Sequence, residues 1–264
     1  MNRLLPALAA LTVLFFTPLR AADTPAKPNV VLIFIDDMGY GDIGPFGSTK
    51  NRTPNLDRMA KEGMKLTSFY AAPVCSVSRA QVITGCYGQR VSLPGVLFPG
   101  APTGISAKEH TVAELMKAQG YATMCIGKWH LGDQPVFLPT RHGFDHYFGI
   151  PYSNDMLKPA KVNGQRVVPL VRDEKVQELL LEDDQDGITA RYTDEAVKFV
   201  TENKSRQFSS TCRTTRGIRR FIRAQNFAAS RRTGASATGS RKWTGAWGAS
   251  STRCANSSSQ KTRS

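Results

Sequence analysis

Cys75 and Arg79 stand four residues apart in the stretch AAPVCSVSRAQVITG, residues 71–85, with two serines between them. The segment just after Cys75 predicts a short helix, and the backbone N–H groups at a helix N-terminus favour an anion. Arg79 lies about one helical turn further on and can face the same place. The spacing therefore predicts an anion-binding site with a thiol nucleophile. Half of a disulfide bond and a buried structural thiol are the alternatives for Cys75.

Asp36 and Asp37 end the apolar run NVVLIFIDD, residues 29–37. Two adjacent carboxylates repel each other and are costly to desolvate unless a cation or basic groups offset them. Their hard oxygen atoms suit Ca²⁺ or Mg²⁺ better than zinc. The pair predicts a metal site, with a solvated pair at a strand end as the alternative. Nearby Asp42 is a further candidate ligand for this site, but we interpret it as a turn residue.

Lys128 and His130 lie two residues apart in the stretch GKWHLG, residues 127–132. In an extended segment, positions i and i+2 point the same way, so both side chains are expected to face one pocket. Lysine carries a fixed positive charge, and histidine exchanges a proton near neutral pH. The glycines at both ends favour a tight functional loop over an unremarkable surface segment.

Strand and helix patterns alternate along the chain around these residues. Apolar runs predict strands at 29–37, 64–72 and 121–127, and start and stop signals predict helices at 53–63, 78–85, 111–120 and 189–203. Thr111 and Glu114 have the spacing of a capping box. The alternation indicates an α/β fold with a largely parallel sheet, in which the first strand is buried on both faces. Ligands bind beyond the carboxyl ends of such strands, where the two aspartates and the GKWHLG stretch fall.

Residues 1–22 have the composition of a secretory signal peptide. A basic residue precedes an apolar stretch, and two alanines precede the polar residues that follow. No later stretch has the length and apolarity of a membrane anchor. We therefore expect an exported protein, periplasmic or extracellular. Five cysteines in an oxidising compartment leave at least one unpaired or modified.

The net charge of +14 is concentrated in one part of the chain. Glu202 is the last acidic residue, and fourteen of the 35 Lys and Arg residues follow it, so residues 1–202 hold 21 basic and 21 acidic residues. The last part is rich in Arg, Ser, Thr, Ala and Gly and is expected to be disordered. Its charge would fit nucleic acid, but it lacks the motif of a folded binding module, so we do not expect a nucleic-acid partner.

The motifs together resemble the sulfatase family. CSVSRA, ITG, GKWHLG and the strand ending in IDDMGYGD occur in the family's order and spacing. FLPTRHGFDHYFGIPYSND, residues 137–155, is similar to the arylsulfatase A-like branch. The resemblance covers residues 29 to about 207. It implies an alkaline-phosphatase-like α/β fold of three layers, α/β/α, and the hydrolysis of a sulfate ester of an aryl alcohol or a sugar.

The resemblance also implies roles for the residues singled out above. In sulfatases a formylglycine-generating enzyme oxidises the cysteine of this motif to an aldehyde, so Cys75 is the expected precursor of the nucleophile. Arg79 is expected to hold the oxygens of the hydrated aldehyde, and Asp36 and Asp37 to bind Ca²⁺ in preference to Mg²⁺. Lys128 and His130 are expected to contact the sulfate and the leaving oxygen.

Val77 departs from the family pattern, which usually has Pro or Ala at that position of the modification signal. A small or rigid residue there helps the unfolded segment to fit the modifying enzyme. A serine-type or thiol-only enzyme is the weaker alternative.

The basic tail is the second departure from the family pattern. After a helix such as 189–203 the family has a strand resembling Phe-Leu-Tyr-Leu-Pro-His, and later an Asp-Asn pair and another lysine, none of which the chain shows. One choice of codons for residues 208–216 encodes Phe-Leu-Tyr-Leu-Pro-His-Tyr-Ala when it is read from the third base. Our hypothesis is that the tail is a frameshifted reading of the missing strand, which sequencing of the gene around the Gln207 codon tests.

The sequence thus predicts three parts: a signal peptide at 1–22, the N-terminal part of a sulfatase catalytic domain at 23–207, and a basic tail at 208–264. We expect little activity, because part of the metal site is missing, and unpaired edges on the buried strands. A phosphomonoesterase or phosphodiesterase of the same superfamily is the alternative enzyme. A non-enzymatic product whose tail binds polyanions is the other alternative. The expected partners are a sulfated small molecule or carbohydrate and the formylglycine-generating enzyme.

Overall fold

A computed structural model describes residues 27–156, 158–162 and 165–213. The predicted signal peptide at 1–22 and the tail beyond residue 213 lie outside the described residues. In the described part, no helix has the length and apolar character needed to cross a membrane.

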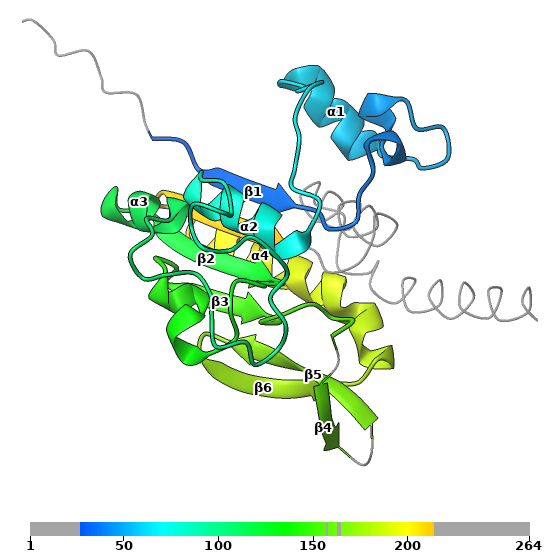
Figure 1. The fold of residues 1–264 in the computed structure, drawn as a ribbon. Coiled ribbons are helices and arrows are strands. Elements are labelled where there is room, and N and C mark those ends of the chain that lie inside the picture. The colour runs from blue at the N-terminus through cyan, green and yellow to red at the C-terminus, as the bar shows by residue number, and fades with distance from the viewer. Residues whose placement is uncertain (1–26, 157, 163–164, 214–264) are drawn as a thin grey trace, which may run out of the picture.

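A seven-stranded sheet forms the centre of the fold (Figure 1). The strand order is β1-β7-β2-β3-β5-β4, and β6 pairs with β5. β1 to β3 and β7 are parallel, whereas β4 to β6 add antiparallel pairs at the other side. The strands are β1 (Val30–Phe34), β2 (Ala122–Gly127), β3 (His146–Gly149), β4 (Lys158–Val162), β5 (Gln165–Arg172), β6 (Lys175–Leu180) and β7 (Phe208–Arg213). The predicted α/β fold is therefore confirmed, with a mixed sheet that is parallel where the motifs lie.

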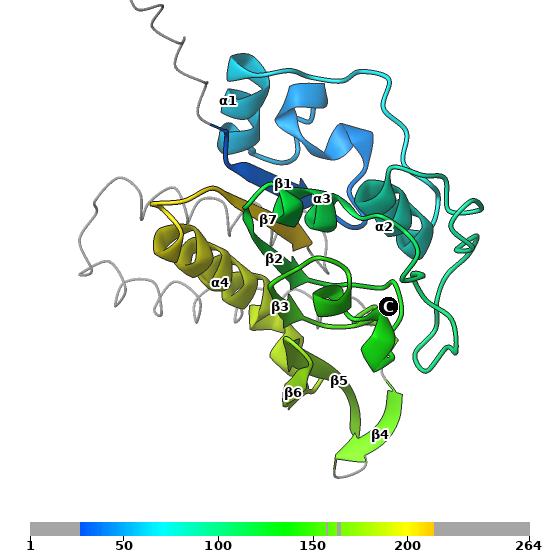
Figure 2. The ribbon, with the colours of Figure 1, turned by 90° about the vertical axis from the view of Figure 1, so that its left-hand side faces the viewer.

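Helices cover both faces of this sheet, which gives three layers (Figure 2). Helices α2 (Cys75–Thr84) and α3 (Val112–Ala118) lie on one face and α4 (Ile188–Glu202) lies on the other. Helix α1 (Pro54–Glu62) lies off the sheet, beyond β1, and packs against the segment Gly44–Phe46 (Figure 1). Short 3₁₀ segments span Tyr40–Asp42, Gly44–Phe46, Pro135–Phe137, Pro139–Arg141 and Asp183–Gly187. The predicted capping box is present, since Thr111 Oγ1 accepts from the Glu114 N–H at 3.1 Å and Glu114 Oε2 accepts from the Thr111 N–H at 3.1 Å.

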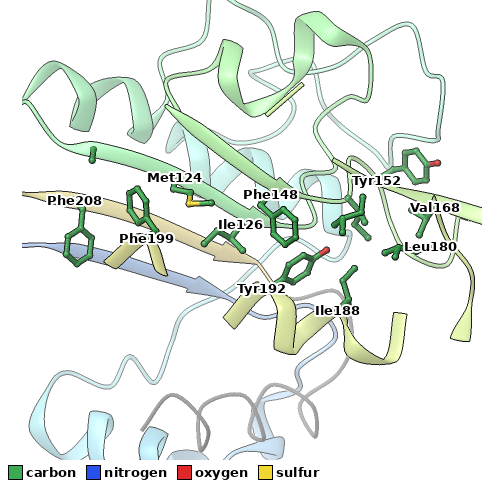
Figure 3. Close-up of a cluster of buried hydrophobic side chains, with 13 residues drawn as sticks. Met124, Ile126, Phe148, Tyr152, Val168, Leu180, Ile188, Tyr192, Phe199 and Phe208 are labelled. Carbon is green, nitrogen blue, oxygen red and sulfur yellow. The ribbon is translucent and has the colours of Figure 1, made fainter. Parts of the chain in front are cut away.

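Alternate side chains of the central strands belong to two separate hydrophobic cores, one on each face of the sheet. On one face Met124 and Ile126 of β2 pack with Tyr192 and Phe199 of α4 (Figure 3). On the other face Cys125, between those two β2 residues, packs with side chains of α2 and α3. This period of two is what a strand buried on both faces requires, and β2 is buried along its whole length.

β7 corrects the predicted boundary of the basic tail. We assigned residues from 208 onward to a disordered tail, but Phe208–Arg213 form a strand between β1 and β2. Hydrogen bonding on both edges holds these residues in the sheet despite their polar composition. The register sets Arg213 level with Phe34 and Gly127, so three strands end together just before Asp36 and Lys128.

Ser210 is an unfavourable residue for the centre of such a sheet. It is 1% exposed, and its hydroxyl has no hydrogen-bond partner within the described part of the chain. We predict that Ser210→Ala raises the free energy of unfolding by about 1–2 kcal/mol, since a sealed, unsatisfied hydroxyl costs about that much. Urea unfolding measures the change. The control is Ser209→Ala, at a neighbouring serine that keeps 7% exposure, with an expected change within about 0.5 kcal/mol. Destabilisation by Ser210→Ala would contradict the prediction.

Two predictions about the first strands are wrong. β1 was expected to be buried on both faces, but Val31 is 54% and Ile33 38% exposed. Residues 64–72 were expected to form a strand, but they are irregular, and Met64, Phe69 and Tyr70 are exposed. Both predictions failed because neighbouring strands are lacking within the described residues. β1 is the edge strand of the sheet, so it is not covered on every side. Residues 64–72 have no strand to pair with.

Candidate functional site

A cavity of about 630 Å³ lies where β1 and β2 end and α2 begins. Three of the residues predicted from sequence for metal binding and nucleophilic attack line it, namely Asp36, Asp37 and Cys75, together with Lys128. Its wall is completed by Phe34, Ile35, Met38, Gly39, Ala71, Ala72, Pro73, Val74, Ser78, Val96, Ser153, Asp155 and Met156. A cavity thus lies at the carboxyl edge of the parallel strands, where the sequence predicted a ligand site.

Asp36 is paired with two cations. Its Oδ2 accepts from Lys128 Nζ at 2.6 Å and from Arg79 Nη2 at 3.1 Å. Burial acts to raise the pKa of this carboxyl, but the charges of Arg79 and Lys128 outweigh it and hold the pKa below its ordinary value. Asp36 is therefore ionised at neutral pH.

Arg79 joins three elements from inside the protein. Its side chain is completely buried, Nη1 donates to the Lys128 carbonyl at 2.5 Å, and the guanidinium lies 5.1 Å from the centre of the Phe34 ring. Burial lowers the pKa of Arg79 and Asp36 opposes that shift. Arg79 does not line the cavity, so the structure does not bring it to the place where we expected it to meet an anion together with Cys75.

Cys75 is the first residue of α2. The residue before it, Val74, provides no side-chain cap for the backbone N–H groups of the first turn. Cys75 is a free thiol of intermediate burial. The disulfide alternative does not hold for this residue in the described structure. A partly accessible thiol at an uncapped helix N-terminus is where an anion is stabilised.

Lys128 and His130 diverge after the end of β2. Lys128 Nζ lies in the site and also donates to Ser153 Oγ at 2.9 Å. His130 has a φ of 61°, in the left-handed region, which breaks the extended alternation on which the prediction of a shared direction rested. Its Nε2 lies 2.8 Å from the Leu97 carbonyl oxygen, and the side chain does not line the cavity.

His130 is neutral at pH 7. Burial, and then the charge of Lys128, lower its pKa to about 4. The unfolded chain binds a proton between pH 6.5 and about 4 that folded His130 excludes, so stability is expected to fall by up to about 3 kcal/mol as the pH is lowered through that window. Urea unfolding at a series of pH values measures this slope.

His130→Gln is expected to remove this part of the slope, because glutamine keeps an N–H donor but does not titrate. His110→Gln is the control, since His110 has an 88% exposed side chain. An unchanged slope in His130→Gln would show that another group is responsible.

Ser153 is a site residue that the sequence reasoning missed. It is buried, contacts Lys128 and lines the cavity. It lies in the PYSND part of residues 137–155, the stretch that is similar to the arylsulfatase A-like branch. Its spacing from the other candidate residues did not distinguish it from other serines. Asp42, by contrast, is the expected turn residue, because its Oδ2 accepts from the Gly39 N–H at 2.7 Å.

Within the described residues the predicted metal ligands do not make a complete calcium site. Asp36 and Asp37 offer the oxygen ligands that Ca²⁺ prefers. In the described ranges, however, no group of three or more His, Cys, Asp or Glu side chains could hold a metal ion, and Asp36 is already paired with Lys128 and Arg79. Ca²⁺ takes about six to eight oxygen ligands, so these residues do not fit the ion by themselves.

The fold and the site define an α/β protein with a cavity at the carboxyl edge of its sheet, lined by a thiol, a lysine and aspartates. A model of the family described as Sulfatase matches residues 28–214, so the chain belongs to the sulfatase family. Rat N-acetylgalactosamine-6-sulfatase is 38% identical over 224 residues, which cover 77% of this chain and 40% of that protein. Bovine arylsulfatase A is 47% identical over 153 residues, which cover 56% of this chain and 30% of that protein.

Solved structures agree with this assignment. The crystal structure of Ps i-CgsB in complex with k-i-k-neocarrahexaose matches with a TM-score of 0.61 and 31% identity, over 72% of this chain and 45% of that one. PsFucS1 sulfatase from Pseudoalteromonas matches with a TM-score of 0.61 and 27% identity, over 73% of this chain and 44% of that one. The alkaline-phosphatase-like fold implied by the resemblance is thereby confirmed, and the chain spans less than half the length of these relatives.

Proposed function

We propose that this chain is the N-terminal part of a sulfuric ester hydrolase of the arylsulfatase type. The observation that supports it most directly is the position of Cys75, at an uncapped helix N-terminus on the wall of a cavity that also holds Asp36 and Lys128. Family membership supports the same reaction.

The proposed nucleophile is a formylglycine made from Cys75. A formylglycine-generating enzyme uses an external oxidant that supplies oxygen to convert the CH₂–SH group of Cys75 to an aldehyde, and the sulfur leaves as sulfide. Water then adds to give two hydroxyls on one carbon. One hydroxyl attacks sulfur while the S–O bond to the alcohol breaks and the alcohol leaves with a proton. The second hydroxyl then loses its proton, the carbon–oxygen bond to sulfate breaks, and sulfate and the aldehyde result. A thiol or a single hydroxyl has no such route for release.

The remaining side chains have electrostatic and positioning roles in this proposal. Lys128 and the N–H groups of α2 attract the sulfate oxygens. The family resemblance gives His130 the exchange of a proton with the leaving oxygen, although its side chain does not line the cavity in this structure. Arg79 holds Asp36 and the Lys128 carbonyl in place, a role that its burial supports better than direct contact with the nucleophile. Asp36 and Asp37 would hold two positions of a Ca²⁺ ion, which supplies polarisation of the sulfate when it is bound.

The substrate class is a sulfated carbohydrate or a sulfated small molecule, and the protein is proposed to act after export. One structural neighbour is a complex with neocarrahexaose, and a curated relative is named for N-acetylgalactosamine 6-sulfate chemistry. We propose that the chain alone turns over slowly, because its described residues include no group of three or more His, Cys, Asp or Glu side chains that could hold a metal ion. A basic tail that binds polyanions is the non-enzymatic alternative, and it lies outside the described residues.

The test compares an aryl sulfate with the matching aryl phosphate, using the chain produced together with a formylglycine-generating enzyme. The phosphatase alternative shares the fold, and a phosphate ester would meet the same cations. Faster release of the alcohol from the sulfate supports the proposal. Faster release from the phosphate, or an unmodified Cys75 thiol in the tryptic peptide, contradicts it.

A further inference from the structure

The segment from Leu97 to Gly100 is tied to three parts of the site. Its first N–H, that of Leu97, donates to Ser76 Oγ at 3.1 Å, and the Leu97 carbonyl lies 2.8 Å from His130 Nε2. Its last N–H, that of Gly100, donates to Asp133 Oδ2 at 2.7 Å. Ser76 is completely buried and follows Cys75 directly. The backbone of this segment therefore connects the first turn of α2 to the ring of His130.

The contact with Leu97 determines which nitrogen of His130 carries the hydrogen. A carbonyl oxygen only accepts, so Nε2 must donate, and in a neutral imidazole Nδ1 is then the unprotonated nitrogen. The pKa of about 4 means that the ring is neutral near pH 7. Nδ1 is buried and has no hydrogen-bond partner among the described residues, so no second contact selects the opposite tautomer.

We propose that Ser76 is a positioning residue that fixes the tautomer of His130 through the backbone of Leu97. Ser76 Oγ holds the Leu97 N–H, which aims the carbonyl of the same residue at Nε2. The lone pair on Nδ1 is left as the only site on the ring where a proton can be accepted without breaking an existing bond.

This arrangement assigns the proton-exchanging atom of the proposed mechanism. When His130 exchanges a proton, the proton enters and leaves at Nδ1, while the Nε2–H bond to Leu97 persists. The inference deepens the proposed function, because it concerns a residue given a role there. The tautomer exists without substrate, so it can be measured separately from hydrolysis. A failed test of the tautomer therefore leaves the proposed hydrolysis open, and a failed test of hydrolysis leaves the tautomer open.

The experiment is long-range ¹⁵N–¹H correlation spectroscopy of the histidine rings in the ¹⁵N-labelled full chain at neutral pH. The chain has four histidines, so His130→Gln identifies the signals of His130. In the parent protein we expect a single tautomer, with Nε2 protonated and Nδ1 not. In Ser76→Ala we expect the single state to be lost and the two nitrogen shifts to move toward a common average.

Two further variants serve as controls. Ser76→Thr keeps a hydroxyl and should restore the parent pattern. Ser78→Ala removes a buried hydroxyl of the same helix that donates to the Ala72 carbonyl at 2.8 Å. The Leu97 N–H donates to Ser76 and not to Ser78, so this variant should leave the pattern unchanged. If Ser76→Ala does not fold, Asp133→Ala removes the acceptor of the Gly100 N–H at the other end of the segment and should produce the same averaging. A parent His130 protonated on Nδ1, or an unchanged tautomer in both Ser76→Ala and Asp133→Ala, would overturn the proposal.

Discussion

Arg79→Met is expected to lower the free energy of unfolding by about 3–5 kcal/mol, the usual range when one partner of a buried ion pair is removed. Methionine fills much of the volume, so the loss comes mainly from the groups that the guanidinium satisfies. The Asp36 carboxylate would lose one of its two cations, and the Lys128 carbonyl would lose its buried donor. Asp36 and Lys128 follow the ends of β1 and β2 and line the cavity, so we expect the loss of the Arg79 guanidinium to disturb the cavity as well.

Urea unfolding of purified variants measures this loss. Arg79→Lys keeps the charge, but lysine lacks the planar fork that reaches two acceptors, so we expect an intermediate loss. The matched control is Arg58→Met, because Arg58 and Glu62 form an exposed pair on α1 at 4.0 Å, with an expected change within about 0.5 kcal/mol. A loss below about 1 kcal/mol for Arg79→Met would mean that Lys128 alone compensates Asp36.

The sequence predicted the parts of the fold that depend on local interactions. The capping box at Thr111 and Glu114 and the start of a helix at Cys75 both involve residues within one turn of each other. The meeting of Asp36, Cys75 and Lys128 at one edge follows from topology, because parallel strands place their carboxyl ends together. These predictions needed no knowledge of which strands are neighbours.

The failures all concern contacts between distant segments. Residues 64–72 alternate like a strand, but alternation does not supply a partner, and in the described structure they have none. β7 is the opposite case. Its polar composition argues against a central strand, yet it forms backbone hydrogen bonds with β1 on one edge and β2 on the other. Val31 and Ile33 are exposed for the same reason, since burial of a β-branched run depends on what packs over it.

The same difference between local and long-range interactions applies to the site. The types of the charged residues indicated an anion site, but their directions depended on backbone angles and on long-range hydrogen bonds. The left-handed φ of His130 turns its ring to Leu97, 33 residues away. Ser153, 25 residues after Lys128, meets it only because β2 and β3 are paired.

Cys75→Ala is expected to abolish both the aldehyde and the hydrolysis of a sulfate ester, with turnover falling by at least about 10³-fold, as when a covalent nucleophile is removed. An aminooxy probe, which reacts with aldehydes, measures the first effect even where turnover is slow. The matched control is Cys86→Ala. Cys86 is a free, partly buried thiol just beyond the C-terminal end of α2 and does not line the cavity, so the variant should label and turn over like the parent.

Cys75→Ser separates the two halves of the proposed chemistry. A serine that the modifying enzyme leaves unchanged has one hydroxyl, so it can attack sulfur but has no second hydroxyl to expel the sulfate. We expect at most one equivalent of alcohol per protein chain, followed by arrest with sulfate bound to residue 75, which mass spectrometry of the tryptic peptide detects. Because Lys128 and the N–H groups of α2 are unchanged in this variant, sulfate-ester binding should persist. Sustained turnover by Cys75→Ser would show that an ordinary hydroxyl suffices, and the site would then belong with the phosphatase alternative, in which attack and release need no second oxygen on the nucleophile carbon.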